Sequence, residues 1–216
     1  MKQLSHEQYL ALHNGAEILA SDSFGEKVLR LKDGSIIKLF RTKRIISSSF
    51  FYPYALRFVN NAAKLATKGI RTLKVIDAYK IPAIKRTAVQ YEELKGETLR
   101  NHIIQNPLND DIIRRLAAFI ARLHNEGIYF RSLHSGNIII DSDIGFGLID
   151  IADMKIKDHP LSIRMRIRNF NHLTRYEIDR NSLKQQKDLF IREYLKMCSL
   201  SDNNSKKLHK TIDRLF

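Results

Sequence analysis

The sequence predicts an α+β fold made of two lobes, an antiparallel sheet over residues 1–94 and a mostly helical lobe over residues 95–216. The main observation is a change near residue 95, where strand-like patterns give way to apolar residues at helical spacing. The chain has 216 residues, 44% of them apolar, which is enough for one compact domain or two small lobes with a core. No repeat of fixed period interrupts this division.

The first lobe is expected to hold a five-stranded sheet and one helix. Strand-like segments occur at residues 17–20, 27–32, 35–40, 73–79 and 87–91. The second and third are joined through Asp33 and Gly34, a strong hairpin turn signal. Helical spacing over residues 55–68 ends at Gly69, which predicts one helix before the last two strands.

The second lobe begins with the strongest helical pattern in the chain. Behind Asn109 and Asp110, which can cap a helix, apolar residues recur at Ile112, Leu116, Phe119, Ile120 and Leu123. This helix is expected to stop at Gly127, before a hairpin over residues 138–140 and 147–149. Apolar residues from Leu183 to Met197 predict one closing helix, and the polar tail over residues 199–210 is expected to be frayed.

Charge and cysteine content narrow the class of protein. Lys and Arg total 37 against 23 Asp and Glu, so the net charge is +14, which attracts phosphate-rich partners or anionic membranes. A single cysteine, Cys198, excludes an internal disulfide and a multi-cysteine zinc site. The longest uncharged run, residues 45–56, is too short to span a bilayer, and the first residues lack an apolar signal core. A cytoplasmic location is therefore expected.

Lys38 lies in the apolar segment 36–40, where a buried ammonium group without a partner is costly. An anion is therefore expected beside it. The alternative is a lysine on the solvated face of an edge strand, with its stem packed on apolar neighbours.

Asn137 and Asp150 stand at the outer ends of the hairpin expected over residues 138–149. The side-chain carbonyl of Asn137 and the carboxylate of Asp150 would give Mg²⁺ the hard oxygen ligands that it prefers, with water and phosphates completing its shell. Taken singly, the asparagine could be a turn residue and the aspartate a helix cap.

The residues around this hairpin resemble the catalytic and metal-binding loops of the protein-kinase-like superfamily. The matching positions are Arg131, Leu133 and Asn137 of the H-R-D-L-x-x-x-N loop and Asp150 of D-F-G. Within the superfamily, the sequence of these motifs is most similar to that of the small bacterial lipopolysaccharide core kinases, the Kdo and heptose kinases. It resembles the toluene tolerance proteins more closely still. The likeness covers residues 5–180 approximately and is strongest over 112–155.

The resemblance implies a small two-lobed protein-kinase-like fold with a shortened helical C-lobe, using ATP and Mg²⁺. Lys38 would contact the α- and β-phosphates, and Asn137 and Asp150 would hold the metal. The segment from Glu92 to Leu94 would meet adenine, and Gly25 would belong to the loop over the phosphates. Only one glycine of that loop's usual three is present, so the backbone is less free to approach the phosphates.

Three departures from the family pattern bear on activity. Ser132 stands where the family has its catalytic Asp. Residues 34–76 contain no acidic residue, so the helix there has no glutamate to pair with Lys38. Phe130 replaces the loop histidine, and residues 151–152 replace the Phe-Gly pair, changes that affect packing more than chemistry.

The candidate catalytic residues are therefore Ser132, Arg131 and His134. A serine can hydrogen-bond the acceptor hydroxyl but cannot hold a proton as a carboxylate does. His134 or Asp153 could reach that hydroxyl instead. The structural alternatives are that His134 caps the loop and that Asp153 binds Arg131 or a backbone amide.

Positive charge is concentrated in two segments. Residues 34–76 hold nine basic residues and no acid. Within them, the aromatic run 45–56 is uncharged and is bracketed by Arg44 and Arg57, a pattern that would allow it to rest at a lipid headgroup boundary. The alternative is that its aromatic residues pack a helix onto the sheet. The second cluster, which could gather an acidic acceptor, comprises Lys155, Lys157, Arg164, Arg166, Arg168, Arg175 and Arg180.

Only 66 residues follow Asp150, and no A-P-E sequence appears, which disfavours a peptide substrate. The leading hypothesis is an ATP- and Mg²⁺-dependent kinase of a lipopolysaccharide core sugar or related anionic glycolipid, with peripheral contact at the inner face of the cytoplasmic membrane. The alternative is a silent pseudokinase that binds nucleotide and signals envelope or solvent stress. The positive charge is the only feature that supports nucleic-acid binding, because the sequence contains no recognisable motif for reading bases. No specific nucleic acid is therefore expected as a partner.

Overall fold

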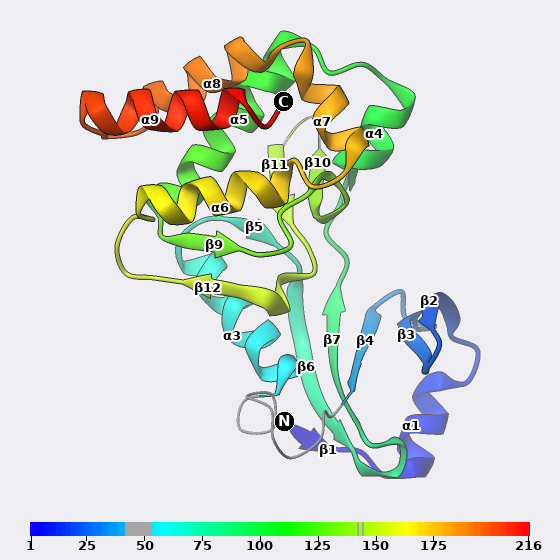
Figure 1. The fold of residues 1–216 in the computed structure, drawn as a ribbon. Coiled ribbons are helices and arrows are strands. Elements are labelled where there is room, and N and C mark those ends of the chain that lie inside the picture. Colours follow the sequence, from blue (N-terminus) through cyan, green and yellow to red (C-terminus); the bar gives the residue numbers. More distant parts are fainter. Residues whose placement is uncertain (42–52, 142, 144) are drawn as a thin grey trace. The chain divides into compact units, whose positions relative to one another are not determined.

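A computed structural model of the chain describes residues 1–41, 53–141, 143 and 145–216 (Figure 1). The fold is α+β, and the chain divides into two compact units, Met1–Leu94 and Lys95–Phe216, here the N-terminal and the C-terminal unit. The division falls where the sequence changes from strand-like to helical patterning. None of the helices in the described part of the chain is long and apolar enough to cross a membrane.

The N-terminal unit is built on a six-stranded sheet in the order β1-β6-β7-β4-β3-β2. Its strands are β1 (Lys2–Gln3), β2 (Glu17–Asp22), β3 (Gly25–Arg30), β4 (Ile36–Arg41), β6 (Lys74–Ile81) and β7 (Arg86–Glu92). β1 runs parallel to β6, and the other pairs are antiparallel. Five of these strands occur where the sequence predicts them, whereas β1 is too short for an alternating pattern to reveal it.

Helices cover both faces of this sheet. The expected helix is α3 (Tyr54–Thr67), and its Phe58 ring centroid lies 6.0 Å from that of Phe40 and 5.5 Å from that of Tyr91. On the other face, α1 (His6–His13) packs Tyr9 into a core cluster with Leu29, Leu31, Ile37, Leu39, Ile81 and Ala88. Short elements β5 (Arg71–Thr72) and η1 (Pro82–Ile84) complete the unit.

The helix α1 was not expected, because its apolar residues show little periodicity. The residues at its start nevertheless form a capping box, which is a sequence signal for a helix N-terminus. The Ser5 hydroxyl accepts a hydrogen bond from the Gln8 backbone N–H at 3.1 Å, and the Gln8 side chain accepts one from the Ser5 N–H at 2.8 Å. The six-stranded sheet therefore has one strand more, and the unit one α-helix more, than the sequence predicts.

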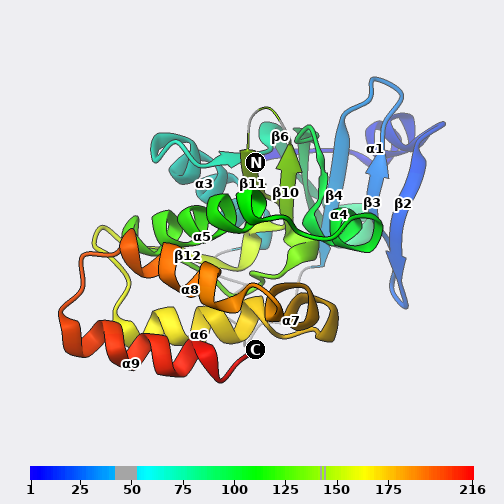
Figure 2. The same ribbon diagram turned by 90° about the horizontal axis from the view of Figure 1, so that it is seen from above.

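The C-terminal unit is mostly helical. Its helices are α4 (Leu99–Gln105), α5 (Asp110–Asn125), α6 (Ile163–Leu173), α7 (Glu177–Lys184), α8 (Lys187–Lys196) and α9 (Asp202–Asp213). In Figure 2, α8 lies beside α5, and α9 runs beside both α8 and α6. As predicted, the Asn109 side chain caps α5 by accepting a hydrogen bond from the Ile112 N–H. Gly127, just after this helix, has φ +75°, and a Cβ there would lie 2.5 Å from the carbonyl oxygens of Lys157 and His159.

Two small β structures lie in the same unit. Strands β8 (Glu97–Thr98), β10 (Ile138–Asp141) and β11 (Gly145–Leu148) form antiparallel pairs with β10 in the middle. Strands β9 (Ile128–Phe130) and β12 (Met154–Ile156) form a separate antiparallel ribbon. The 3₁₀ turns η2 (Ser135–Asn137) and η3 (Ile151–Asp153) connect them.

The end of the chain differs from the sequence prediction. The single closing helix expected from Leu183 to Met197 is divided between α7 and α8, with a break at residues 185–186. The prediction of a frayed tail over residues 199–210 is wrong, because α9 is capped by Ser201 and buries Leu208 and Ile212. These two apolar residues lie one turn apart on an otherwise mostly polar helix, whose low apolar content makes it look like a polar tail in the sequence.

A buried polar network holds α5, α6 and α8 together. His124 is fully buried, with Nδ1 2.8 Å from the Tyr194 hydroxyl and Nε2 3.2 Å from Asn169 Oδ1. Arg166 is also buried and donates to Tyr194 and to Asn125 Oδ1, each at 2.9 Å. Arg166 therefore serves the interior and does not belong to the surface charge cluster in which the sequence reading placed it.

We expect the unfolding free energy to fall as the pH is lowered from 7 to 5, by about 2 kcal/mol from His124 alone. Burial, and then the charge of Arg166, lower the pKa of His124 to about 3 in the folded state. Below pH 6.5 the unfolded chain therefore binds a proton that the folded chain does not, so acid favours unfolding. Urea titrations at both pH values check this. The difference should shrink by a similar amount in His124→Gln, and an unchanged difference in that variant would contradict the assignment.

Candidate functional site

The β10–β11 hairpin brings Asn137 and Asp150 to the same end of one rigid element. Ile138 pairs with Leu148 in the antiparallel register, so Asn137 directly precedes one strand and Asp150 closely follows the other. The Ile149 N–H donates to the Asn137 carbonyl oxygen at 3.1 Å, which extends the pairing by one step. The two residues predicted to bind a metal are therefore held on adjoining chain ends.

The Asn137 side chain is buried and oriented by its neighbours. Its Nδ2 donates to the Ser132 carbonyl oxygen at 2.9 Å and lies 3.2 Å from His134 Nε2. Both contacts use the amide nitrogen, which leaves the amide oxygen Oδ1 for another partner. An oxygen presented in this way is the kind of ligand that Mg²⁺ prefers.

Asp150 is exposed and has left-handed backbone angles, φ 54° and ψ 41°. Such a conformation is uncommon for residues other than glycine, asparagine and aspartate, and it costs free energy where it occurs. Asp150 precedes the turn η3, but its side chain makes no capping hydrogen bond to it, so the helix-cap alternative is wrong. Backbone strain at an exposed carboxylate is a feature of functional sites.

Ser132 and Arg131 lie in the turn between β9 and η2. Arg131 Nη1 is 3.4 Å from Asp153 Oδ1, and the Arg131 N–H donates to the Asp153 carbonyl oxygen at 3.4 Å. This is the structural role considered for Asp153. The Ser132 side chain is half-buried, and its carbonyl is the acceptor for Asn137, so the backbone of this residue helps to orient the amide.

His134 lies against Asn137 in the loop. Burial, followed by the nearby positive charge of Arg100, lowers its pKa below the ordinary value of 6.5. Because Nε2 faces the amide nitrogen of Asn137, it acts as the acceptor and Nδ1 carries the proton. His134 therefore orients Asn137 within the loop, and its ring packs edge-on against Tyr176 with centroids 5.1 Å apart.

A polar cluster beneath this loop was not predicted from the sequence. The Ser135 hydroxyl donates to Asp179 Oδ1, and Arg100 Nε donates to the same hydroxyl at 3.2 Å. Arg100 Nη2 lies 3.5 Å from Asp179 Oδ2, and the Asp179 side chain is 2% exposed. The cluster ties the loop to α4 and α7. Its members are 35 to 79 residues apart, and no local pattern in the sequence links them.

In the N-terminal unit, Lys38 is on β4, which lies between β3 and β7. The alternative of an edge-strand lysine is therefore wrong. Lys38 and Phe40 alternate onto the sheet face that α3 covers, and Lys38 Nζ lies 5.9 Å from the Phe40 ring centroid. The polar residue on the buried face of α3 is Asn61, in place of an acid.

The other predicted nucleotide contacts lie at two ends of the same sheet. Gly25, with φ +101°, opens β3 after the tight turn from β2. The Glu92 side chain is exposed at the end of β7 and pairs with Lys74 at 2.9 Å. Leu94 is the last residue of the unit. Lys38, Gly25, Glu92 and Leu94 thus belong to one unit, and Ser132, Arg131, His134, Asn137 and Asp150 to the other.

The side chains present limit the kind of metal site that the described residues can form. Across residues 1–41, 53–141, 143 and 145–216, no group of three or more His, Cys, Asp or Glu side chains could hold a metal ion. A site closed by protein ligands is therefore absent from the described residues. The pair of Asn137 and Asp150 fits the other mode of Mg²⁺ binding, in which one or two protein oxygens share the ion with nucleotide phosphates.

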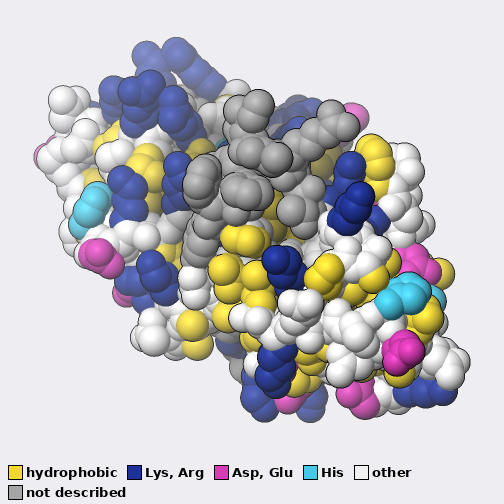
Figure 3. Space-filling view, turned by 90° about the horizontal axis from the view of Figure 1, so that it is seen from below, with side chains coloured by type: hydrophobic (Ala, Val, Ile, Leu, Met, Phe, Trp, Pro, Cys, Tyr) yellow, Lys and Arg dark blue, Asp and Glu magenta, His cyan; other side chains and the backbone are white. Residues whose placement is uncertain are grey.

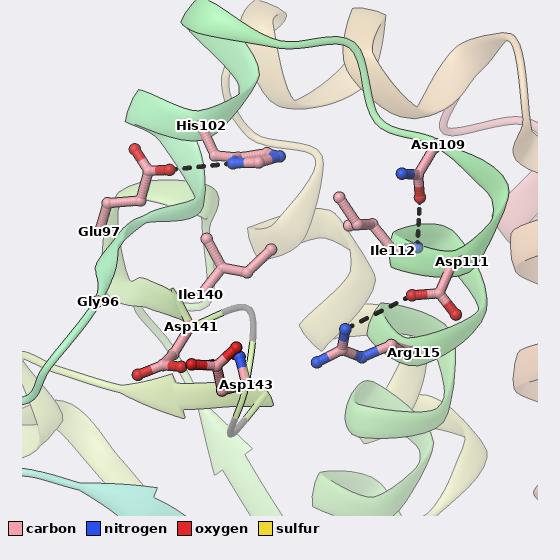
Figure 4. Close-up of a pocket in the computed structure, with 10 residues that line it drawn as sticks. All are labelled: Gly96, Glu97, His102, Asn109, Asp111, Ile112, Arg115, Ile140, Asp141 and Asp143. Carbon is pink, nitrogen blue, oxygen red and sulfur yellow. Dashed lines mark hydrogen bonds and ion pairs between the residues drawn. The ribbon is translucent and has the colours of Figure 1, made fainter.

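A pocket of about 650 Å³ lies elsewhere in the C-terminal unit, between the ends of α4 and β10 and the start of α5. Figure 4 shows the Glu97–His102 pair on one wall, the Asp111–Arg115 pair on the other, and the Asp141 and Asp143 side chains between them. None of the site residues predicted from the sequence lines it.

Comparison with known proteins assigns neither a family nor a function to the chain. No protein-family model matches the chain. No curated protein matches it either. The functional argument therefore depends on the residues of the two units themselves.

Proposed function

We propose that the chain is an ATP- and Mg²⁺-dependent phosphotransferase with a protein-kinase-like fold, acting on a lipopolysaccharide core sugar or a related anionic glycolipid. The observation that carries the proposal is the pair of Asn137 and Asp150 on the β10–β11 hairpin, with one amide oxygen and one strained, exposed carboxylate at the same end. The motif spacing that resembles the kinase-like loops supports it.

In this proposal Asn137 Oδ1 and the Asp150 carboxylate would hold Mg²⁺, which would neutralise charge on the nucleotide phosphates. Lys38 contacts the α- and β-phosphates from the N-terminal unit. Gly25 lies over the phosphates, and the backbone from Glu92 to Leu94 meets adenine. Phosphoryl transfer depends mostly on positioning and electrostatic stabilisation, so it can proceed slowly without a strong base.

Ser132 would hydrogen-bond the acceptor hydroxyl, with Arg131 beside it and His134 holding Asn137 in place. Two observations favour the alternative, a silent pseudokinase that binds nucleotide and signals envelope or solvent stress. Ser132 replaces a carboxylate, and the buried polar position of α3 is Asn61. The two functions differ in one measurable respect, because only the first transfers phosphate.

The proposed location is the cytoplasm, with peripheral contact at the inner face of the cytoplasmic membrane. The aromatic run 45–56 was the feature considered for that contact. Residues 45–52 lie outside the described residues, whereas Tyr54 opens α3 and its ring stacks on Phe40, with centroids 6.4 Å apart. That part of the run packs onto the sheet, as its alternative interpretation supposed.

Asp150→Asn is expected to abolish transfer of labelled phosphate from ATP to isolated core glycolipid. Asparagine tolerates the left-handed backbone of this residue, so the change removes the charge without adding strain. Asp158→Asn, an exposed acid beyond β12, is the matched control and should keep wild-type activity. Nucleotide binding without transfer to any component of a cell-envelope extract would instead support the pseudokinase.

Lys38→Met should weaken Mg–ATP binding by at least about tenfold while the protein stays folded, because it removes a charge-assisted contact with phosphate. Methionine keeps an unbranched apolar stem of similar length against Phe40. Calorimetric titration measures the affinity, with the exposed Lys80→Met as the control. Equal Mg–ATP affinities for wild type and Lys38→Met would refute the assigned role of the lysine.

Ser132→Asp is expected to raise the residual transfer rate, by about tenfold, because a carboxylate restores a general base beside the acceptor hydroxyl. The rate is measured under single-turnover conditions, so that product release does not mask the chemical step. A lower rate than wild type would show that the serine belongs to a different mechanism.

A further inference from the structure

The outer face of α6 carries a line of exposed arginines, Arg164, Arg168 and, just past its C-terminal cap, Arg175. Spacings of four and seven residues place them on one side of the helix. The opposite side is buried. At about 1.5 Å of rise per residue the line is roughly 16 Å long.

The positive surface continues from α6 onto the β9–β12 ribbon. The Tyr129 hydroxyl lies 3.2 Å from His172 Nε2 on α6, and Lys155 is directly opposite Tyr129 in the ribbon. Burial, and then the charges of Arg131 and Arg175, lower the pKa of His172, and the charge of Asp153 opposes them. We call this surface the α6 strip; its residues are Arg164, Arg168, Arg175, Arg131 and Lys155, with the rings of Tyr129, His172 and Tyr176.

Within the strip Arg131 pairs with Asp153, and the other four cations are exposed. Among the residues that the structure describes, none forms an ion pair with Arg164, Arg168 or Lys155. Arg180 donates to the carbonyl oxygens of Thr174 and Arg175, so its guanidinium is held against the chain that follows α6. The face drawn in Figure 3 shows Lys and Arg side chains in groups with few Asp and Glu among them. Grouped cations of this kind attract multiply charged anions.

One end of the strip reaches the candidate catalytic loop. The Tyr176 ring packs against His134, and the Arg175 guanidinium lies 5.8 Å from the Tyr176 centroid. Arg131 directly precedes Ser132. A chain-like anion lying along the strip would therefore end beside the residue expected to meet the acceptor hydroxyl.

We propose that the α6 strip binds an acidic saccharide chain, the part of the acceptor that carries carboxylate or phosphate groups. Guanidinium groups match both anions in a bidentate manner, and the rings offer flat surfaces between them. A membrane surface is disfavoured because Tyr176 is the one exposed large apolar side chain in the strip, too little to anchor a helix in a bilayer. The inference rests on the proposed function in calling this ligand the acceptor.

The test measures binding of a fluorescein-labelled hexagalacturonate to the full chain by anisotropy, with labelled maltohexaose as the neutral ligand control. R164Q/R168Q removes two charges from the strip. K206Q/K210Q removes two charges at the same spacing from exposed positions of α9. We expect at least about tenfold weaker binding of hexagalacturonate in the first variant and a change of about twofold or less in the second.

Equal losses in the two variants, or no binding of hexagalacturonate by the wild type, would overturn the proposal. So would strip-dependent binding of phosphatidylglycerol vesicles without binding of the saccharide. Mg–ATP affinity is measured on the same samples and should be unchanged in R164Q/R168Q. A wild type that binds hexagalacturonate through the strip but does not bind Mg–ATP would refute the proposed function and leave the saccharide surface standing.

Discussion

The candidate site depends on one backbone hydrogen bond, from the Ile149 N–H to the carbonyl oxygen of Asn137. It continues the β10–β11 ladder past its last strand pair and fixes the chain leading to Asp150 against the chain leaving Asn137. The ladder brings an amide and a carboxylate thirteen residues apart to one end of the hairpin, and this bond holds the two chain segments together one step further. The hairpin thus turns a separation in sequence into a fixed spatial relation.

Around this hairpin, side chains hold the loop from three directions. Asn137 is oriented by Ser132 and His134, and Arg131 is tied to Asp153. Ser135 is bound by Asp179 of α7 and Arg100 of α4. Two of these residues, Ser132 and His134, were expected to act on a substrate. The contacts show that both also shape the loop, one through its backbone and the other through its ring.

Elements with strong local patterns were predictable from the sequence. The Asn109 cap and the apolar spacing behind it define α5, and alternation with turn residues defines the two hairpins. The helix α9 was missed because its residues are mostly polar, although Leu208 and Ile212 lie one turn apart and Ser201 caps it. The helix α1 was missed because its apolar residues show little periodicity, although its capping box could have located it.

The candidate site was predictable only in part. Spacing alone placed Asn137 and Asp150 at one hairpin end, because the register of a hairpin follows from its apolar pattern and the length of its turn. Whether an arginine faces water or the interior is decided by packing far away in the sequence. Arg164 and Arg166 are two residues apart on α6, yet the first is exposed and the second lies among Tyr194, Asn125 and Leu161.

At Asp150 the left-handed backbone lowers the stability of the fold, whereas the carboxylate serves the proposed metal site. An L-residue in that region carries a conformational cost on the order of 1 kcal/mol, which glycine would relieve. Selection for thermal resistance alone would therefore enrich glycine at this position and discard the carboxylate. A retained aspartate would record selection for what its side chain does, whether in binding a ligand or in contacts within the protein.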